Sequence, residues 1–255
     1  MLILSLVAGV VVAVVTAPVG VSGAVFLLPI QLSVLHIPNP AVTPTNLLFN
    51  VVAIPGALAR YRRRSPLRNP LTTTLLLGTV PGVMLGAVVR VTLIPGPTIF
   101  RLLVAAFLLP LGIWLCLPTR RPIQAATGPS TRFTITAAVV VGTLGGIYGI
   151  GGGSLLSPIL IGRGMPMATV APAALLTTFI TSIAGAATYL LLAITTAGGN
   201  IAPYWTVGIC AGTGGLIGAY LGALLQPHLP ERVLHITLGA SAIATASLYL
   251  AQAGH

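Results

Sequence analysis

The chain has 255 residues, of which 56% are apolar and only 5% are charged. Twelve residues are basic, all of them arginine, and Glu231 is the single acidic residue, so the formal net charge is +11. A water-soluble domain could not cover its surface with so few charges, and we therefore expect most of the chain to face lipid. The arginines stand between long apolar runs instead of along one solvated face, which argues against a nucleic-acid partner.

Long apolar runs follow one another from the first residues to the last. A helix needs about 20 apolar residues to cross the hydrocarbon core of a bilayer. The runs near this length are 2–17 with 24–35, 41–59, 71–93, 98–117, 133–148 with 153–162, 168–195, 203–225 and 232–251. They predict an all-α fold, a polytopic transmembrane helical bundle. The first seventeen residues lack a basic start and a cleavage site, so we interpret them as a retained helix and not as a signal peptide.

A duplicated unit accounts for most of the chain. The segment from Gly20 to Pro29 recurs as Gly149 to Pro158. After a one-residue gap, Pro38, Pro44 and Leu47-Leu48 recur as Pro166, Pro172 and Leu175-Leu176. We expect residues 1–117 to form a first membrane repeat, residues 118–132 a basic cytoplasmic linker, and residues 133–255 a second membrane repeat. Homologous hydrophobic halves that are broken by glycine and proline at the same place are typical of membrane transporters.

Each half also contains a ladder of glycines spaced by four residues. The ladders are Gly78, Gly82 and Gly86 in the first half and Gly214, Gly218 and Gly222 in the second. Small residues at this spacing let helix backbones approach closely in lipid. We interpret both ladders as packing seams between helices.

The first unit of each half is too long for one simple span and is interrupted, at 18–23 and at 149–153. Each unit is either a broken crossing, which gives parallel repeats, or a helix followed by a re-entrant half-helix, which gives inverted repeats. Short cytoplasmic loops are enriched in arginine. With the loop 60–69 inside, inverted repeats leave only Arg90 and Arg101 outside, whereas parallel repeats also leave Arg163 and Arg232 there. Arginine placement therefore favours inverted repeats, with both termini outside.

The glycine-rich breaks are the candidate for function. Glycine costs about 1 kcal/mol relative to alanine in a helix, so the cluster around Gly151 predicts a break. At membrane depth, the N–H and C=O groups of irregular backbone need hydrogen-bond partners from protein or from a water-filled cavity. Half-helices that begin near Ala24 and Ser154 would present N–H groups and positive dipole ends to such a cavity. Two such ends make an anion site that requires no charged side chain. The alternative is simple helix breaking or tight packing; a P-loop is excluded because the chain contains no lysine.

The helix after each break supplies uncharged polar groups. Asn46 and Asn50 are four residues apart and share one helix face. Thr177, Thr178, Thr181 and Ser182 occupy the matching depth in the other half, and Thr178 aligns with Asn50. Alternatively, the hydroxyls bond carbonyls of their own helix and the asparagines join neighbouring helices. The candidate substrate-binding residues are Gly20, Ser22, Gly23, Asn46, Asn50, Gly151, Gly152, Gly153, Ser154, Thr177 and Thr178.

Other functional groups are sparse. Cys116 and Cys210 lie far apart, and the histidines lack metal-binding spacing, so we expect neither a metal nor a cofactor. The chain has no aspartate, and we place Glu231 in a loop, so a buried carboxylate cannot couple protons or sodium. We interpret Arg90 and Arg101 as anchors of helix ends, with a role in attracting anions as the alternative.

At these residues the chain resembles the TauE/SafE family of sulfite exporters. The resemblance rests on a glycine-rich break, a proline and an Ala-x-x-Thr-like segment in each half. These read Gly149 to Pro158 followed by Ala171 to Thr178, and Gly20 to Pro29 followed by Thr43 to Asn50. The first break is poorer in glycine, with Ser22 and Ala24 where the other half has Gly151 and Gly153. The resemblance implies movement of sulfite, sulfonates or related sulfur oxyanions across a bacterial plasma (inner) membrane.

We therefore interpret the chain as a multi-pass membrane transporter and not as an enzyme. Its partners would be a small anionic substrate and the lipid bilayer. Whether the chain forms a homo-oligomer is left open by the sequence. One half would rock against the other to give alternating access. Two alternatives are a passive anion channel with the same site and an intramembrane serine hydrolase that uses Ser22 or Ser154. The hydrolase would need a base within hydrogen-bond reach of the serine.

Overall fold

The structure, a computed structural model, describes residues 1–63, 69–94, 97–117, 130–163, 165–195 and 201–253. Within these ranges the chain is all-α, without strands, as predicted. The elements are α1 (Leu2–Thr16), the 3-10 turn η1 (Ala17–Val19), α2 (Ala24–Pro29), the π-helical turn η2 (Ile30–Val34), α3 (Asn39–Tyr61), α4 (Pro70–Thr92), α5 (Pro97–Cys116), α6 (Thr131–Tyr148), α7 (Gly152–Gly162), α8 (Met167–Thr195), α9 (Trp205–Leu225), the 3-10 turn η3 (Gln226–His228) and α10 (Glu231–Ala253).

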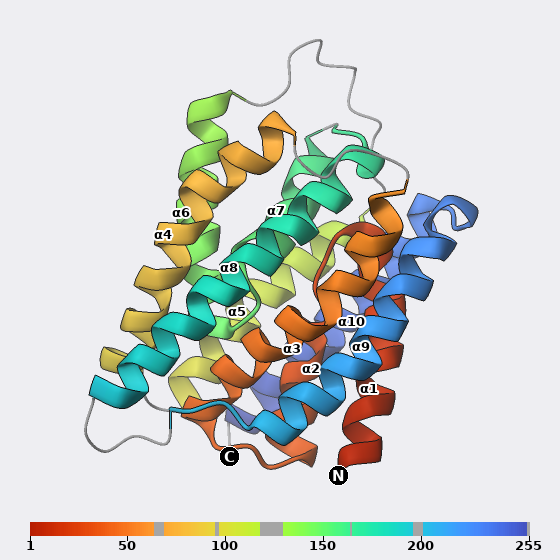
Figure 1. The fold of residues 1–255 in the computed structure, drawn as a ribbon. Coiled ribbons are helices and arrows are strands. Elements are labelled where there is room, and N and C mark those ends of the chain that lie inside the picture. The colour runs from red at the N-terminus through yellow and green to blue at the C-terminus, as the bar shows by residue number, and fades with distance from the viewer. Residues whose placement is uncertain (64–68, 95–96, 118–129, 164, 196–200, 254–255) are drawn as a thin grey trace.

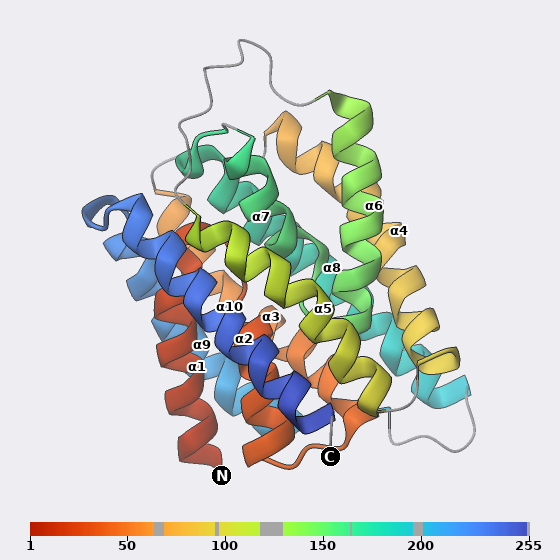
Figure 2. The ribbon, with the colours of Figure 1, turned by 180° about the vertical axis from the view of Figure 1, so that it is seen from behind.

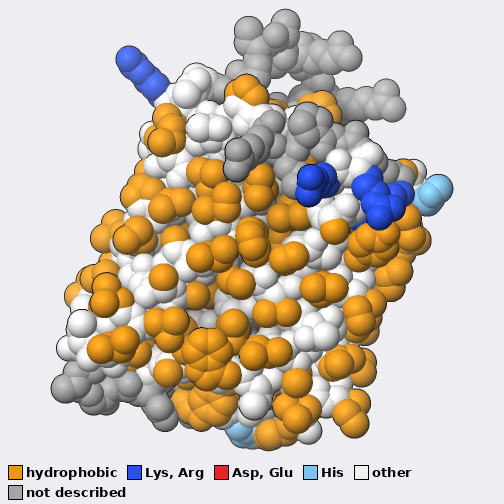
Figure 3. Space-filling model, in the orientation of Figure 1, with side chains coloured by type: hydrophobic (Ala, Val, Ile, Leu, Met, Phe, Trp, Pro, Cys, Tyr) orange, Lys and Arg blue, Asp and Glu red, His pale blue; other side chains and the backbone are white. Residues whose placement is uncertain are grey.

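Among the residues that the structure describes, six helices are long and apolar enough to cross a membrane, namely α1, α3, α4, α6, α8 and α9. The apolar segments of α5, α10, α7 and α2 with η2 are shorter. Hydrophobic side chains cover the middle of the molecule in Figure 3, and the arginines on that face gather near one end. This distribution of apolar and charged side chains is that of a multi-pass membrane protein.

The directions of the helices place the two termini at the same end of the bundle (Figure 1). From that end α1 runs to the opposite end, and α2 runs back toward the end where α1 begins (Figures 1 and 2). In the second half α6 runs in the opposite direction to α1, and α7 turns back. The Arg163 guanidinium carbon, just after α7, lies 3.7 Å from the ring centroid of Phe133 near the start of α6. Each break is therefore a hairpin of a long and a short helix.

At one end of the bundle α3 and α7 finish and α6 and α10 begin, and we call it the arginine-rich end. We call the opposite end, where both chain termini lie, the terminal end. Described arginines next to these helix termini are Arg60, Arg62, Arg63, Arg132, Arg163 and Arg232. Arg90 and Arg101 lie near the terminal end, in the last turn of α4 and the first turns of α5. Arg64, Arg68 and residues 118–129, most of the predicted linker, lie outside the described residues.

The glycine ladders pack as seams, and they join helices from different halves. A Cβ atom built on Gly82 of α4 would lie 2.5 Å from the carbonyl oxygen of Val139 in α6. A Cβ atom on Gly218 of α9 would lie 2.3 Å from the carbonyl oxygen of Val10 in α1. Because a side chain does not fit at these contacts, the ladders bring the backbones of α4 and α6, and of α9 and α1, into close contact.

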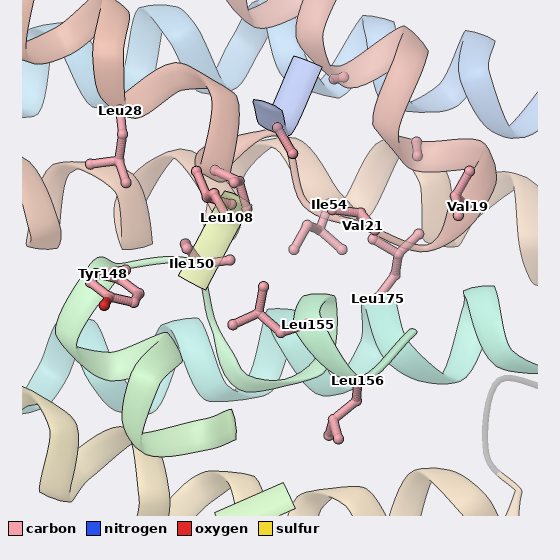
Figure 4. Close-up of a cluster of buried hydrophobic side chains, with 14 of the residues drawn as sticks. Val19, Val21, Leu28, Ile54, Leu108, Tyr148, Ile150, Leu155, Leu156 and Leu175 are labelled. Atoms are coloured by element: carbon pink, nitrogen blue, oxygen red, sulfur yellow. The ribbon is translucent and has the colours of Figure 1, made fainter. Parts of the chain in front are cut away.

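The two breaks lie in one hydrophobic core. Val19 and Val21 of the first break belong to the same cluster of buried side chains as Ile150 and Leu155 of the second (Figure 4). The two half-helices differ after this point. Pro29 is the last residue of α2 and is followed by η2, in which Leu35 N–H donates to the carbonyl of Ile30 at 2.9 Å. Pro158, at the matching position, lies inside α7, which continues as an α-helix to Gly162.

Candidate functional site

Each break begins at a glycine in the left-handed conformation. Gly20 has φ 76° and ψ 20°, and Gly149 has φ 72° and ψ 23°. A Cβ atom on Gly20 would lie 2.5 Å from the Cα of Ala171, and one on Gly149 would lie 2.3 Å from the carbonyl oxygen of Thr43. Both the conformation and the close approach require glycine. Each break thus packs against the helix that follows the other break, which brings the two breaks together.

The starts of the two half-helices meet at Ser22 and Ser154. The backbone N–H of Ser22, two residues before α2, donates to Ser154 Oγ in the first turn of α7 at 3.0 Å. The hydroxyl oxygens of Ser154 and Thr178 are also 3.0 Å apart. All three side chains are buried and uncharged. The first turns of two helices that come from distant parts of the sequence are therefore joined by hydroxyl groups.

Asn50 connects both breaks from the side of α3. Its Nδ2 donates to the carbonyl oxygen of Ile150 at 3.0 Å and to Ser182 Oγ at 3.1 Å, and its Oδ1 accepts from the hydroxyl of Ser22. One fully buried amide thus holds the first break, the second break and α8. An amide with its donors and acceptor all paired fixes the relative position of these segments.

The other predicted residues lie around this centre with different roles. Gly152 N–H donates to Thr181 Oγ1 at 3.1 Å, and Asn46 Nδ2 donates to the carbonyl of Ala24 at 3.2 Å. Gly23 is the N-cap residue of α2, and Gly151, with φ 77° and ψ 151°, is that of α7. A Cβ atom on Gly153 would lie 2.1 Å from the carbonyl oxygen of Ala174.

The surroundings of two predicted residues, Thr177 and Gly152, differ from those of the others. The hydroxyl of Thr177 is buried and has no hydrogen-bond partner among the described residues. Gly152 faces α4 and α6, since its nearest side chain is that of Thr79, 2.5 Å from a built Cβ atom. A bulky side chain at Gly152 would therefore disturb helix packing as well as any bound anion.

Sequence reasoning missed two hydroxyls that hold the breaks. Ser157 donates to the carbonyl oxygen of Val19, and Thr43 donates to that of Ile147 at 3.2 Å. Each of these bonds joins one break to a helix of the other half. Ser157 directly precedes Pro158, and Thr43 directly precedes Pro44. Polar residues next to the repeated prolines were the signal that could have identified them.

The starts of the two half-helices differ in how their backbone N–H groups are bonded. The first four N–H groups of an α-helix have no partner within the helix. At the start of α7 the N–H of Gly152 donates to Thr181 Oγ1 at 3.1 Å. At the start of α2 the N–H of Ala24 donates to Ser22 Oγ at 3.1 Å, and those of Phe26 and Leu27 donate to the carbonyl of Gly23. The positive end of the helix dipole adds to these donors. The start of α7 is therefore suited to a small anion.

The described site is closed in this conformation. A cavity beside Ser22 and Gly23 has a volume of about 10 Å³, and Thr16 is the other polar residue that lines it. Such a volume is at the lower limit for one water molecule. An oxyanion of several atoms would have to displace the hydroxyls that now fill the centre.

The two serines considered for a hydrolase are bonded to other groups of the site. The hydroxyl of Ser22 is bonded to Asn50, and that of Ser154 lies against Thr178 and the carbonyl of Ile150. Among the described residues no histidine hydrogen-bonds to either serine, and no cluster of three potential metal ligands occurs.

Comparison with known proteins identifies the family. Residues 5–249 match the family described as sulfite exporter TauE/SafE. This chain belongs to the TauE/SafE family, which is a family of membrane transporters. The resemblance read from the glycine-rich breaks is thereby confirmed.

A plant protein shows similarity to part of the chain. The Arabidopsis thaliana protein described as "Sulfite exporter TauE/SafE family protein 5" is 42% identical over 64 residues. This stretch is 25% of the present chain and 14% of the plant protein, so the chain covers only a small part of its relative's length. No solved structure matches the chain.

Proposed function

We propose that the protein transports small sulfur-containing oxyanions, sulfite or organosulfonates, across a bacterial plasma membrane. The observation that carries the proposal is the meeting of two helix starts at the hydrogen bond from Ser22 N–H to Ser154 Oγ, at a buried and uncharged point. Family membership supports transport, and the family's description supports the substrate class.

The anion would bind where the protein now bonds to itself. An oxyanion would take the place of the Ser154 hydroxyl as acceptor for Ser22 N–H, and would accept further hydrogen bonds from the start of α7 and from Thr178. Asn50 would orient both breaks around it. Binding by uncharged donors compensates one or two negative charges and still lets the anion leave, which pairing with a buried arginine would oppose.

The glycine seams suggest which parts of the protein move. Because α1 packs tightly on α9, and α4 on α6, the moving bodies do not coincide with the two halves of the sequence. We propose that α1, α3 and α9 form one body and that α4, α6 and α8 form the other. Alternating access would result when these bodies tilt about the contact of α3 with α8, where Asn50 lies.

The proposed orientation places the arginine-rich end in the cytoplasm and both termini outside. The opposite directions of α1 and α6, and of α3 and α8, support inverted repeats, with residues 1–117 and 133–255 as the two halves (Figures 1 and 2). The excess of arginine at one end supports the orientation.

Flux measurements on purified protein in liposomes test the proposal. Thr178→Val keeps the shape of the side chain but removes a hydroxyl from the site, and Asn50→Ala removes the amide that joins both breaks. Loss of one hydrogen bond of about 1–1.5 kcal/mol to the bound anion corresponds to about a tenfold loss of affinity. We expect at least this loss for sulfite with Thr178→Val, and a larger one with Asn50→Ala.

A matched control is Thr213→Val. Thr213 is exposed on α9 and donates to the carbonyl of Ile209 at 2.8 Å, the same type of bond that Thr178 makes to Ala174. Flux that is unchanged in all three variants would contradict the site. Uphill accumulation driven by a proton gradient separates a transporter from a passive channel, since a channel can only equilibrate the anion.

A further inference from the structure

Arg90 is a buried cation near the terminal end of the bundle. It stands in the last turn of α4, and only 2% of its surface is exposed. One Nη donates to the carbonyl of Ile94, the other donates to the carbonyl of Asn39 at 3.2 Å, and the guanidinium carbon lies 4.4 Å from the ring centroid of Phe100. These contacts tie the end of α4 to the starts of α3 and α5, as the sequence suggested.

The anchoring contacts leave two features of Arg90 unexplained. Its Nε is buried and has no hydrogen-bond partner among the described residues. No side-chain carboxylate among the described residues balances its charge, because Glu231, the single acidic residue of the chain, begins α10 at the arginine-rich end (Figure 2). A buried charge without an opposite charge is costly in proteins. An anionic ligand would provide both the missing charge and the missing acceptor.

Arg90 lies on a short path from the terminal end to the second break. Ala87, three residues before Arg90 on α4, belongs to the same buried cluster as Tyr189, and the hydroxyl of Tyr189 donates to the carbonyl of Gly146 at 2.9 Å. On the other side, Phe100 contacts Tyr148 edge to face, with ring centroids 5.7 Å apart. Gly146 and Tyr148 are the residues that lead into Gly149. A ligand held by Arg90 would thus stand next to the entrance of the break.

We propose that Arg90 is an anion-docking residue, a second binding position for the sulfur oxyanion between the terminal end and the central site. The oxyanion would accept from Nε–H and take the place of the Ile94 carbonyl as acceptor for an Nη. The planar guanidinium fork matches two oxygens of an oxyanion. This inference rests on the proposed function and adds a position to it.

The test compares Arg90→Gln with Arg101→Gln in proteoliposomes of defined orientation. Both variants remove one positive charge near the terminal end, but Arg101 is partly exposed. For sulfite presented at the terminal end, we expect Arg90→Gln to raise the half-saturating concentration about tenfold or more, because a charge-assisted pair of hydrogen bonds is lost. The maximal rate should change much less, and so should the half-saturating concentration for sulfite presented at the arginine-rich end. Arg101→Gln should behave like the wild type.

Arg90→Lys covers the case in which Arg90→Gln does not fold. It keeps the charge but not the fork, and we expect an intermediate rise in the half-saturating concentration. An unchanged half-saturating concentration in the folded variants would overturn the docking role. Absence of sulfur-oxyanion flux in the wild type would instead contradict the proposed function, so the two failures are distinguishable.

Discussion

Tyr61 and Tyr189 make the same hydrogen bond at corresponding places in the two halves of the chain. The phenol of Tyr61 donates to the carbonyl of Ala17 at 3.2 Å, and that of Tyr189 donates to the carbonyl of Gly146 at 2.9 Å. Each tyrosine stands seventeen residues after a repeated proline, and each carbonyl stands three residues before a repeated glycine. Both breaks are therefore held from the far end of the following long helix.

Removing the phenolic hydroxyl of either tyrosine should destabilise the fold by a similar amount. Tyr61→Phe and Tyr189→Phe each remove one buried hydrogen bond, which contributes about 0.5–1.5 kcal/mol. The carbonyl of Ala17 keeps the N–H of Gly20 as a donor at 3.1 Å. The measurement is thermal unfolding of the purified protein in detergent. Tyr204→Phe is the control, since Tyr204 is 40% exposed. Equal unfolding temperatures for all three variants and the wild type would refute a structural role for these bonds.

The glycine seams should tolerate no side chain. In Gly86→Ala, the new Cβ would lie 2.1 Å from the carbonyl oxygen of Thr143, and in Gly214→Ala it would lie 2.0 Å from that of Leu6. Overpacking of this kind costs about 1–3 kcal/mol, and we expect a lower unfolding temperature and a lower yield of folded protein. Leu85→Ala changes a lipid-exposed position on the same helix as Gly86 and should have a smaller effect. A lower unfolding temperature for Leu85→Ala than for Gly86→Ala would show that the helix backbones are not in close contact at the seams.

Gln31→Leu should stabilise the protein. Gln31 is fully buried in η2, and neither side-chain amide atom has a hydrogen-bond partner among the described residues. The corresponding position of the second half is Leu160. Removing an unsatisfied buried amide is expected to raise the free energy of unfolding by about 1–3 kcal/mol. Gln226→Leu should do the opposite, since Gln226 donates to the carbonyl of Pro18 at 2.8 Å. Destabilisation by Gln31→Leu would indicate that the amide has a partner in the membrane.

Accessibility of introduced cysteines tests the orientation. In a variant without Cys116 and Cys210, we expect a membrane-impermeant maleimide added outside to label Leu93→Cys and Tyr204→Cys. Arg62→Cys and Arg163→Cys should react only after the membrane is permeabilised. All four positions have exposed side chains. Labelling of Arg163→Cys from outside, together with protection of Tyr204→Cys until the membrane is permeabilised, would reject inverted repeats.

The hydrophobic spans could be predicted closely from the sequence because apolar runs contrast sharply with the loops between them. The run 41–59 became Asn39–Tyr61, and 71–93 became Pro70–Thr92. The repeat with its glycine breaks also directed attention to residues that the structure brings together, such as Ser22, Asn50 and Ser154.

Partners across the bundle could not be predicted in the same way. Periodicity shows that Gly82 lies on a packing face, but it does not say that this face meets α6 instead of a helix of its own half. The bonds of Thr43 and Ser157 depend equally on which segments become neighbours. The closure of the site by its own hydroxyls is a property of three-dimensional packing that no single-sequence pattern contains.

The exchange of helices between the halves has a consequence for biosynthesis. When α1 enters the membrane, its close partner α9 has not yet been translated, and α4 likewise precedes α6. The glycine-lined grooves must wait in contact with lipid or an insertion factor until the later helices arrive. Neither half can therefore reach its final packing alone. Two fragments that are produced separately, divided in the region that joins α5 to α6, together contain all the surfaces needed to assemble.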